Sequence, residues 1–161
     1  MLSGTENPVA AEQDRKVTEA AARGWRVKVH HVQPRGPEEF DDVFAEIARD
    51  RADAVIVGLG TGFFVHRQRM VEAAARHRLP AIYFRRQFVE SGGLMAYAAS
   101  LRDEYAVAAR LVDKILRGAK PADLPVEQST KFEFVLNLKT AKALGLTIPQ
   151  SLLQRADQII E

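Results

Sequence analysis

Short apolar runs alternate with amphipathic segments along most of this chain, and this alternation constrains the fold more than any other feature. Residues 54–57 and 81–84 are continuous apolar runs, which are typical of strands buried on both faces of a parallel sheet. Residues 25–32 alternate apolar and polar side chains with the period of two that a strand requires. We therefore predict an α/β domain with a doubly wound, mostly parallel sheet and helices on both faces.

Capping residues indicate where the first two helices begin and end. Asn7 and Pro8 suit the N-cap and first helical positions, because Asn accepts a bond from an orphan amide and Pro lacks an N–H there. Gly24 suits the position after the last helical residue, so a helix is expected over residues 8–23. A second helix begins near Pro37, and its apolar stripe is Phe40, Val43, Phe44 and Ile47.

The pattern becomes less regular after the strand at 81–84, which follows a third helix expected over residues 63–78. The remaining segments are a turn-rich piece at 85–93, a strand at 94–97, a helix at 101–117, a proline-containing linker, a strand at 131–137, and helices at 138–144 and 149–156. We predict a single α/β lobe over residues 1–161. It divides into core βα units (1–98), a crossover helix with its linker (99–125), and a C-terminal strand with helices (126–161).

The charge and cysteine content exclude several classes of protein. The 23 basic and 21 acidic residues give a net charge of +2 and are interspersed, which argues against nucleic-acid binding. No stretch approaches the roughly 18 apolar residues of a membrane span, so no membrane insertion is expected. The absence of cysteine excludes disulfides and thiolate catalysis, and it leaves the cellular compartment open.

A glycine-rich loop, residues 58–62, follows the strand at 54–57 where a dinucleotide fingerprint would lie. The spacing differs from that fingerprint, because Phe63 occupies the position of the third glycine and no acid ends the following strand. A glycine turn at the carboxyl edge of the sheet is the favoured interpretation, and open α/β sheets bind small ligands at that edge. Gly60 and Thr61 are therefore candidate ligand-binding residues.

The histidines and serines give no support to catalysis or metal binding. His30 and His31 are neighbours on an expected strand and point to opposite faces, and neither His66 nor His77 has a metal-like spacing. No serine lies in a Gly-x-Ser-x-Gly elbow. We predict that the chain is not an enzyme, holds no metal and uses no cofactor.

An aromatic and basic cluster ends the strand at 81–84. Tyr83 and Phe84, followed by Arg85, Arg86 and Gln87, could supply an aromatic wall and a guanidinium, which together hold a ring and a carboxylate. The alternative is that the aromatic residues only alternate across the sheet and the arginines are solvated. Tyr97 is a second, similar candidate.

Four longer blocks of sequence, at residues 79–83, 88–95, 112–128 and 130–149, closely resemble one family. They are similar to the C-terminal half of the periplasmic-binding-protein-like ABC transporter substrate-binding proteins, in the group that includes tryptophan and tyrosine binders. The resemblance extends from Asn7 to Glu161. It implies a flavodoxin-like lobe of the type I periplasmic-binding-protein kind, one of two that clamp a ligand by hinge closure.

The resemblance also implies a site and partners. The segments at Thr5, Glu6 and Asn7, at Gly60 and Thr61, and at residues 83–87 would face the cleft. The expected ligand is a small amino-acid-like solute and the expected partner is an ABC permease. Family members are periplasmic, whereas this chain has no signal peptide and would be cytoplasmic if expressed as written.

The N-terminal lobe of the family has no counterpart here, so we expect a truncated product whose first strand is clipped and whose solute binding is impaired. In the family, the helix at 101–117 packs on that other lobe, yet it keeps an apolar stripe at Ala108, Leu111, Val112 and Ile115. A homodimer through this helix or through the clipped first strand is therefore predicted. The alternatives are an orphan self-associating domain without a solute and, least favoured, a nucleotide-binding sensor or enzyme.

Overall fold

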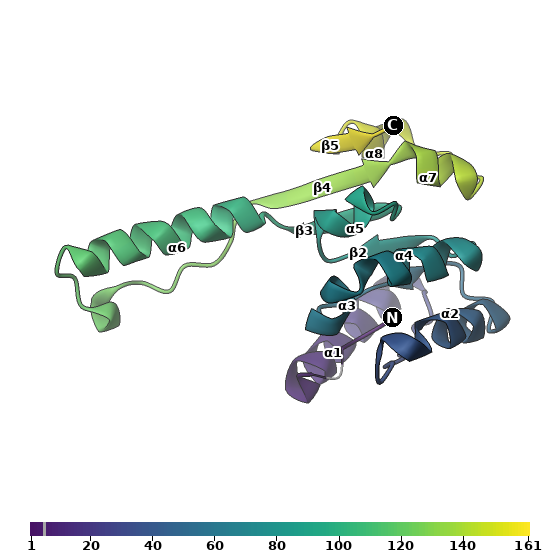
Figure 1. The fold of residues 1–161 in the computed structure, drawn as a ribbon, viewed down its shortest axis with the longest axis horizontal. Helices are drawn as coiled ribbons and strands as arrows, with labels where there is room; N and C mark the ends of the chain where they lie inside the picture. Colours follow the sequence, from purple (N-terminus) through teal and green to yellow (C-terminus); the bar gives the residue numbers. More distant parts are fainter. Residues whose placement is uncertain (5) are drawn as a thin grey trace.

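The computed structural model of the chain describes residues 1–4 and 6–161, and a five-stranded sheet organises these residues (Figure 1). Neighbouring strands of the sheet are also consecutive in the chain: β1 (Val55–Ile56), β2 (Ala81–Tyr83), β3 (Met95–Ala99), β4 (Phe132–Asn137) and β5 (Gln158–Ile160). The pairs β1–β2, β2–β3 and β4–β5 are parallel, and β3–β4 is antiparallel. The sheet is thus mixed and mostly parallel, as the sequence predicted.

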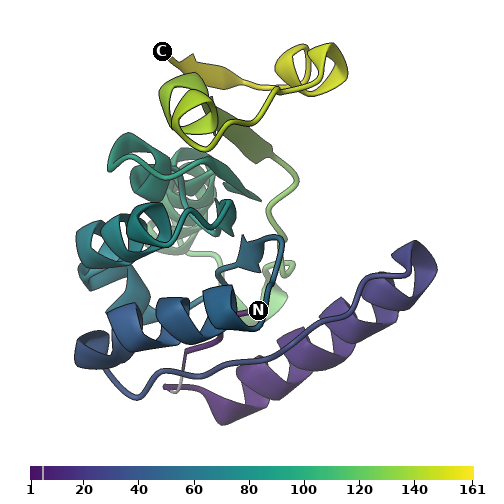
Figure 2. The same cartoon turned by 90° about the vertical axis from the view of Figure 1, so that its right-hand side faces the viewer.

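Helices connect the strands and cover the sheet. Along the chain they are α1 (Pro8–Trp25), a 3-10 turn (Pro37–Glu39), α2 (Phe40–Arg49), α3 (Thr61–Val65), α4 (Arg67–Arg76), α5 (Arg86–Glu90), α6 (Leu101–Leu116), a second 3-10 turn (Pro121–Asp123), α7 (Leu138–Ala143) and α8 (Gln150–Leu153). Figure 2 shows α2 and α4 on one side of β1, with α1 on the other. None of the helices within the described residues is long and apolar enough to cross a membrane.

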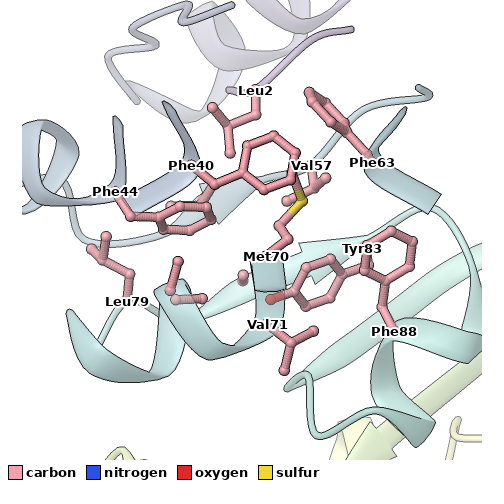
Figure 3. Close-up of a cluster of buried hydrophobic side chains, with 14 of the residues drawn as sticks. Leu2, Phe40, Phe44, Val57, Phe63, Met70, Val71, Leu79, Tyr83 and Phe88 are labelled. Atoms are coloured by element: carbon pink, nitrogen blue, oxygen red, sulfur yellow. The ribbon is translucent and has the colours of Figure 1, made fainter. Parts of the chain in front are cut away.

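The core lies between one face of the sheet and helices α2, α4 and α5 (Figure 3). Alternate strand residues Val55, Val57 and Tyr83 point into it, where they meet Phe44 of α2 and Phe88 of α5, as well as α4. The opposite face is open, so the expectation that residues 54–57 are buried on both faces is wrong. Ile56, on that face, is 44% exposed. The reason is that only α1 approaches this face near β1.

The first residues of the chain extend the sheet beyond β1. Leu2 forms parallel bridges with both Val32 and Val57, its N–H donates to the Ile56 carbonyl oxygen at 2.8 Å, and its side chain is fully buried. Both sides of this short strand are therefore paired within the described residues, and the homodimer predicted through it stays a prediction. The strand expected over residues 25–32 reduces to the single bridge at Val32.

Several element boundaries differ from the sequence prediction. Helix α1 does not end at Gly24 but continues to Trp25, and Arg26 takes the left-handed cap conformation (φ 56°). The helix expected at 63–78 breaks at His66 into α3 and α4. The turn-rich piece at 85–93 contains α5, and β5 follows a C-terminal helix that is shorter than expected.

Helix α6 projects away from the sheet (Figure 1). Ser100 caps its first turn by accepting a hydrogen bond from the Asp103 N–H, and Gly118 (φ 101°) follows its end. The chain then returns along the helix, where Arg110 and Glu127 form an ion pair. No residue of α6 is buried within the described part of the chain, so its apolar stripe has no packing partner there.

Candidate functional site

A cavity of about 450 Å³ lies at the carboxyl ends of β1 and β2. Three segments surround it: the N-terminal loop with the first turns of α1, the glycine-rich loop with the start of α3, and the residues after β2. This is the edge where open α/β sheets bind ligands. Its lining residues are Ser3, Gly4, Glu6, Asn7, Ala10, Ala11, Asp14, Leu59, Gly60, Thr61, Phe64, Phe84, Arg85 and Leu101.

The start of α1 is fixed by its N-cap. Asn7 Oδ1 accepts a hydrogen bond from the Ala10 N–H at 3.0 Å, and Pro8 occupies the first turn. Helical periodicity then places Ala10, Ala11 and Asp14 on the same side of the helix as Asn7, toward the cavity. The Asn7 amide oxygen is thus used in capping, and its Nδ2 group donates no hydrogen bond to a residue that the structure describes.

Glu6 ties the N-terminal loop to the glycine-rich loop. Its Oε1 accepts a hydrogen bond from the Gly62 N–H at 2.9 Å, at the first turn of α3. Its Oε2 crosses over Gly4, where an added Cβ would lie 2.3 Å from that oxygen. A side chain at position 4 would therefore displace the carboxylate. Thr5, the third candidate in this loop, lies outside the described residues.

Arg85 supplies the guanidinium of the cavity. Its Nη1 donates to the Ala99 carbonyl oxygen at 3.2 Å, and its Nη2 lies 3.6 Å from Glu104 Oε2. These contacts anchor the side chain to the end of β3 and the first turn of α6. The guanidinium is partly buried and keeps donor capacity for a further acceptor, because five N–H groups are available to it.

Aromatic rings form the apolar wall of the cavity. Phe64 and Phe84 both line it, and both rest on the buried Phe88, with ring centroids 6.3 Å and 5.1 Å from that of Phe88. Arg67 lies over the outer face of Phe64, with its guanidinium carbon 5.4 Å from the ring centroid. The wall is therefore supported from the core and is positioned before any ligand arrives.

Asp14 gives the cavity a second carboxylate. It lines the cavity on α1, and it forms no hydrogen bond or ion pair with any residue that the structure describes. Asp14 and Glu6 provide negative charge to the cavity lining, and Arg85 provides positive charge. This arrangement suits a small molecule that carries both an ammonium and a carboxylate group.

A second cavity, of about 420 Å³, adjoins the first along α1. The two share Ala10, Asp14, Leu59 and Phe84, so they form one continuous groove. The second part runs over the open face of the sheet, lined by Val17, Ile56, Ile82 and Tyr97. Tyr97 is 58% exposed and stacks on Phe132, with ring centroids 5.4 Å apart.

The structure separates the sequence-predicted residues into groups. Glu6, Asn7, Gly60, Thr61 and Arg85 line the first cavity together, and Tyr97 lines the adjoining part. Sequence reasoning missed Asp14, Phe64 and Leu101. Asp14 could have been found from the face of α1 on which it lies, which is apolar and acidic. Nothing in the sequence near Leu101 indicated that this residue lines the cavity.

Three of the predicted residues do not face the first cavity. Tyr83 was expected as an aromatic wall, but its side chain is 2% exposed and stacks on Phe88, with centroids 4.8 Å apart, and burial raises the pKa of its hydroxyl. Arg86 instead pairs with Glu90 at 2.9 Å and donates to Gln158 at 2.7 Å. Gln87 lines neither cavity, and its buried Oε1 has no hydrogen-bond partner among the described residues.

The reason for these differences is the short helix α5. Because α5 begins at Arg86, directly after β2, the chain turns away from the sheet edge at that residue. Only Phe84 and Arg85 remain at the mouth of the cavity. The side chain of Tyr83, one residue earlier, points from β2 into the core.

Comparison with known families identifies the chain. The profile of the ABC transporter substrate binding protein family matches residues 9–160. The chain belongs to this family. It is a family of substrate-binding proteins rather than a class of enzymes. No curated protein sequence matches the chain significantly.

Solved structures show the same fold. The chain is similar to an ABC domain from Streptococcus pneumoniae in complex with L-Trp (TM-score 0.86, 24% identity, 99% of this chain and 55% of that one). It is also similar to a conserved domain protein from Vibrio cholerae (TM-score 0.86, 21% identity, 98% and 54%). A third similar structure is a ligand-free, open substrate-binding protein with adhesive properties from Clostridium difficile (TM-score 0.70, 19% identity, 99% and 52%). The chain spans about half the length of these proteins.

Proposed function

We propose that this chain is a non-enzymatic solute-binding lobe of an ABC-type uptake system, and that it binds a small amino-acid-like molecule. One observation carries the proposal: aromatic, basic and acidic side chains converge on one cavity at the carboxyl edge of the sheet. A structural neighbour of the chain was solved in complex with L-Trp, which supports a ligand of this kind.

The chemistry of the cavity suits a zwitterion. Arg85 can donate hydrogen bonds to a carboxylate in a bidentate geometry, and Asp14 with Glu6 can accept hydrogen bonds from an ammonium group. Phe64 and Phe84 can contact an apolar or aromatic side chain between these charges. The solute would therefore lie across the groove, with its side chain toward the aromatic wall.

A second lobe would complete the site. The cavity opens to solvent, whereas binding sites of this kind bury about 70–90% of a small ligand. The matched structures are roughly twice as long as this chain, which supports an interlobe cleft closed by hinge motion. Without that lobe, we expect weak binding. We also propose the partner and location typical of the family, an ABC permease and the space outside the cytoplasmic membrane.

Substitution of two adjacent arginines, Arg85 inside the cavity and Arg86 outside it, tests the proposed solute binding. Thermal unfolding of the chain would be followed with L-Trp, L-Tyr, a sugar and a purine, because a ligand of the native state raises stability by about 2.7 kcal/mol at a hundredfold excess over its Kd. Arg85→Gln should abolish the shift given by an amino acid. Arg86→Gln should leave that shift intact, since Arg86 pairs with Glu90 outside the cavity.

The outcomes separate clearly. An amino-acid shift that both variants retain would remove Arg85 from the site. No shift with any solute, for the wild-type chain at millimolar concentrations, would contradict solute binding by this lobe and would favour the alternative of a self-associating domain without a solute.

The exposed stripe of α6 supports that second candidate, and we propose that the chain forms a homodimer through it. Val112, Ile115 and Leu116 are all exposed on this helix, and no residue of the helix is buried within the described part of the chain. Light scattering at increasing concentration would detect the dimer. Val112→Lys should shift the chain to monomer, whereas Ala106→Lys, at an exposed position on the side of α6 away from this stripe, should not. A monomer at every concentration would refute the dimer.

A further inference from the structure

The end of α1 lies in a basic segment of the chain that is free of acidic residues. Residues 20–37 contain no Asp or Glu; residues 73–89 and 134–156 also lack them, but neither of those segments contains a tryptophan. The segment holds Arg23, Arg26, Lys28 and Arg35, together with the only tryptophan of the chain, Trp25. Its local charge of +4 exceeds the net charge of +2 for the whole protein. This is a concentration of positive charge around one large aromatic side chain.

The end of α1 exposes these side chains to solvent. Trp25 is 82% exposed and Val27 is 59% exposed. Arg23, Arg26 and Lys28 are exposed as well, and none of the three forms a salt bridge with a residue that the structure describes. We call Arg23, Trp25, Arg26, Val27 and Lys28 the basic-aromatic patch.

Local backbone geometry creates the patch. The left-handed conformation of Arg26 ends α1, and the Val27 N–H donates to the Ala22 carbonyl oxygen at 3.1 Å. The chain therefore turns sharply after the helix, which keeps Trp25 out of the core. Figure 2 shows this end of α1 projecting from the rest of the molecule.

The patch is remote from the solute cavity. The cavity contacts α1 at Asn7, Ala10, Ala11 and Asp14, near its beginning. Trp25 lies 11 residues after Asp14, the last of these residues, which is about 16 Å along a helix axis. The patch is therefore separate from the proposed solute site.

We propose that the basic-aromatic patch docks the protein on an anionic lipid surface. Tryptophan concentrates at the boundary between lipid headgroups and acyl chains, because its ring is apolar and its N–H is polar. Each Lys or Arg near an anionic membrane surface adds to the attraction. The exposed Val27 adds apolar contact of a kind that a lipid surface accepts and that a phosphate backbone does not.

Trp25 reports on this docking directly, because it is the only tryptophan. Its fluorescence would be recorded while the full chain is titrated with vesicles of phosphatidylcholine, with or without phosphatidylglycerol. With the anionic vesicles, we expect a blue shift and protection from an aqueous quencher, both weakened by salt. Zwitterionic vesicles should give little change.

Charge-reversal variants with equal net charge provide the matched control. Arg26→Glu with Lys28→Glu should lower partitioning onto anionic vesicles by roughly 25-fold or more, because each cation contributes about a fivefold factor. Lys139→Glu with Lys142→Glu, on exposed positions of α7, should leave partitioning nearly unchanged. Figure 2 shows α1 and the C-terminal region that contains α7 at opposite ends of the molecule.

Three results would overturn the proposal. Equal loss in both double variants would mean that only the net charge matters. A Trp25 response to short duplex DNA as large as that to anionic vesicles would mean polyanion binding rather than lipid docking. No blue shift with vesicles that contain mostly phosphatidylglycerol at low salt would mean that the patch does not meet the membrane.

Discussion

Replacing Phe88 by Ala tests whether the aromatic cluster beneath the cavity stabilises the fold. Phe88 is fully buried on α5, and it contacts Tyr83 of the core and both aromatic walls of the cavity, Phe64 and Phe84. Removing a buried phenyl ring costs about 3–5 kcal/mol, because apolar burial is lost and a cavity remains. Three ring contacts are lost together, so the upper half of this range is expected.

The matched substitution is Phe132→Ala on β4. Phe132 is half exposed and makes one stacked contact, with Tyr97. Its removal should cost about 1 kcal/mol, the contribution of a single aromatic pair beyond its buried area. For a chain of this size each kcal/mol lowers Tm by about 2–4 °C, so Phe88→Ala should lower Tm by about 10 °C or more and Phe132→Ala by only a few degrees.

Urea unfolding followed by far-ultraviolet circular dichroism would measure both losses. Trp25 fluorescence is unsuitable, because that side chain is already exposed in the folded state. The m-value should not change in either variant, since both fold to the same structure. If Phe88→Ala costs no more than Phe132→Ala, then α5 does not pack on the core as described, and the support of the cavity wall would have to be reconsidered.

Two glycines and one histidine give further predictions for the same unfolding assay. Gly24→Ala should stabilise the chain by about 0.5–1 kcal/mol, since Gly24 is helical and an added Cβ meets nothing within 4 Å; a loss would instead favour Gly24 as the left-handed cap. Gly93→Ala should destabilise it strongly, because a Cβ would lie 2.6 Å from the Tyr83 ring and 2.8 Å from the Phe88 carbonyl oxygen; a neutral effect would contradict that packing. Burial lowers the pKa of His31 from its usual 6.5, so the unfolded chain binds the proton first and stability should fall as pH drops through 6.5. His31→Gln should reduce that fall, and an unchanged pH dependence would contradict the assignment.

Much of the fold was predictable from local sequence, and the exceptions have physical causes. The stripe at Phe40, Val43, Phe44 and Ile47 is buried as expected, because helical periodicity fixes which side of α2 is apolar. The sequence prediction failed for short elements. Helix α5 and strand β5 each span five residues or fewer, and so few residues carry little periodic signal.

The candidate site was predictable in position but only partly in composition. Sequence reasoning placed the cavity at the carboxyl edge and brought Glu6, Gly60, Thr61 and Arg85 to it. Sequence reasoning could not decide which of two adjacent side chains faces the core and which faces the cavity. Tyr83 and Phe84 are adjacent and similar in chemistry, yet one is in the core and the other lines the cavity.

The sequence by itself determined the α/β alternation, the family and the edge of the sheet at which the candidate cavity lies, because these depend on periodicity, caps and glycine positions that are local along the chain. Only the tertiary structure decided which side chains face the cavity, that one face of the sheet is open, and that α6 projects without a partner. Those features depend on which distant segments come together, such as Leu2 pairing between Val32 and Val57. Contacts of that range leave no periodic trace in the amino-acid sequence.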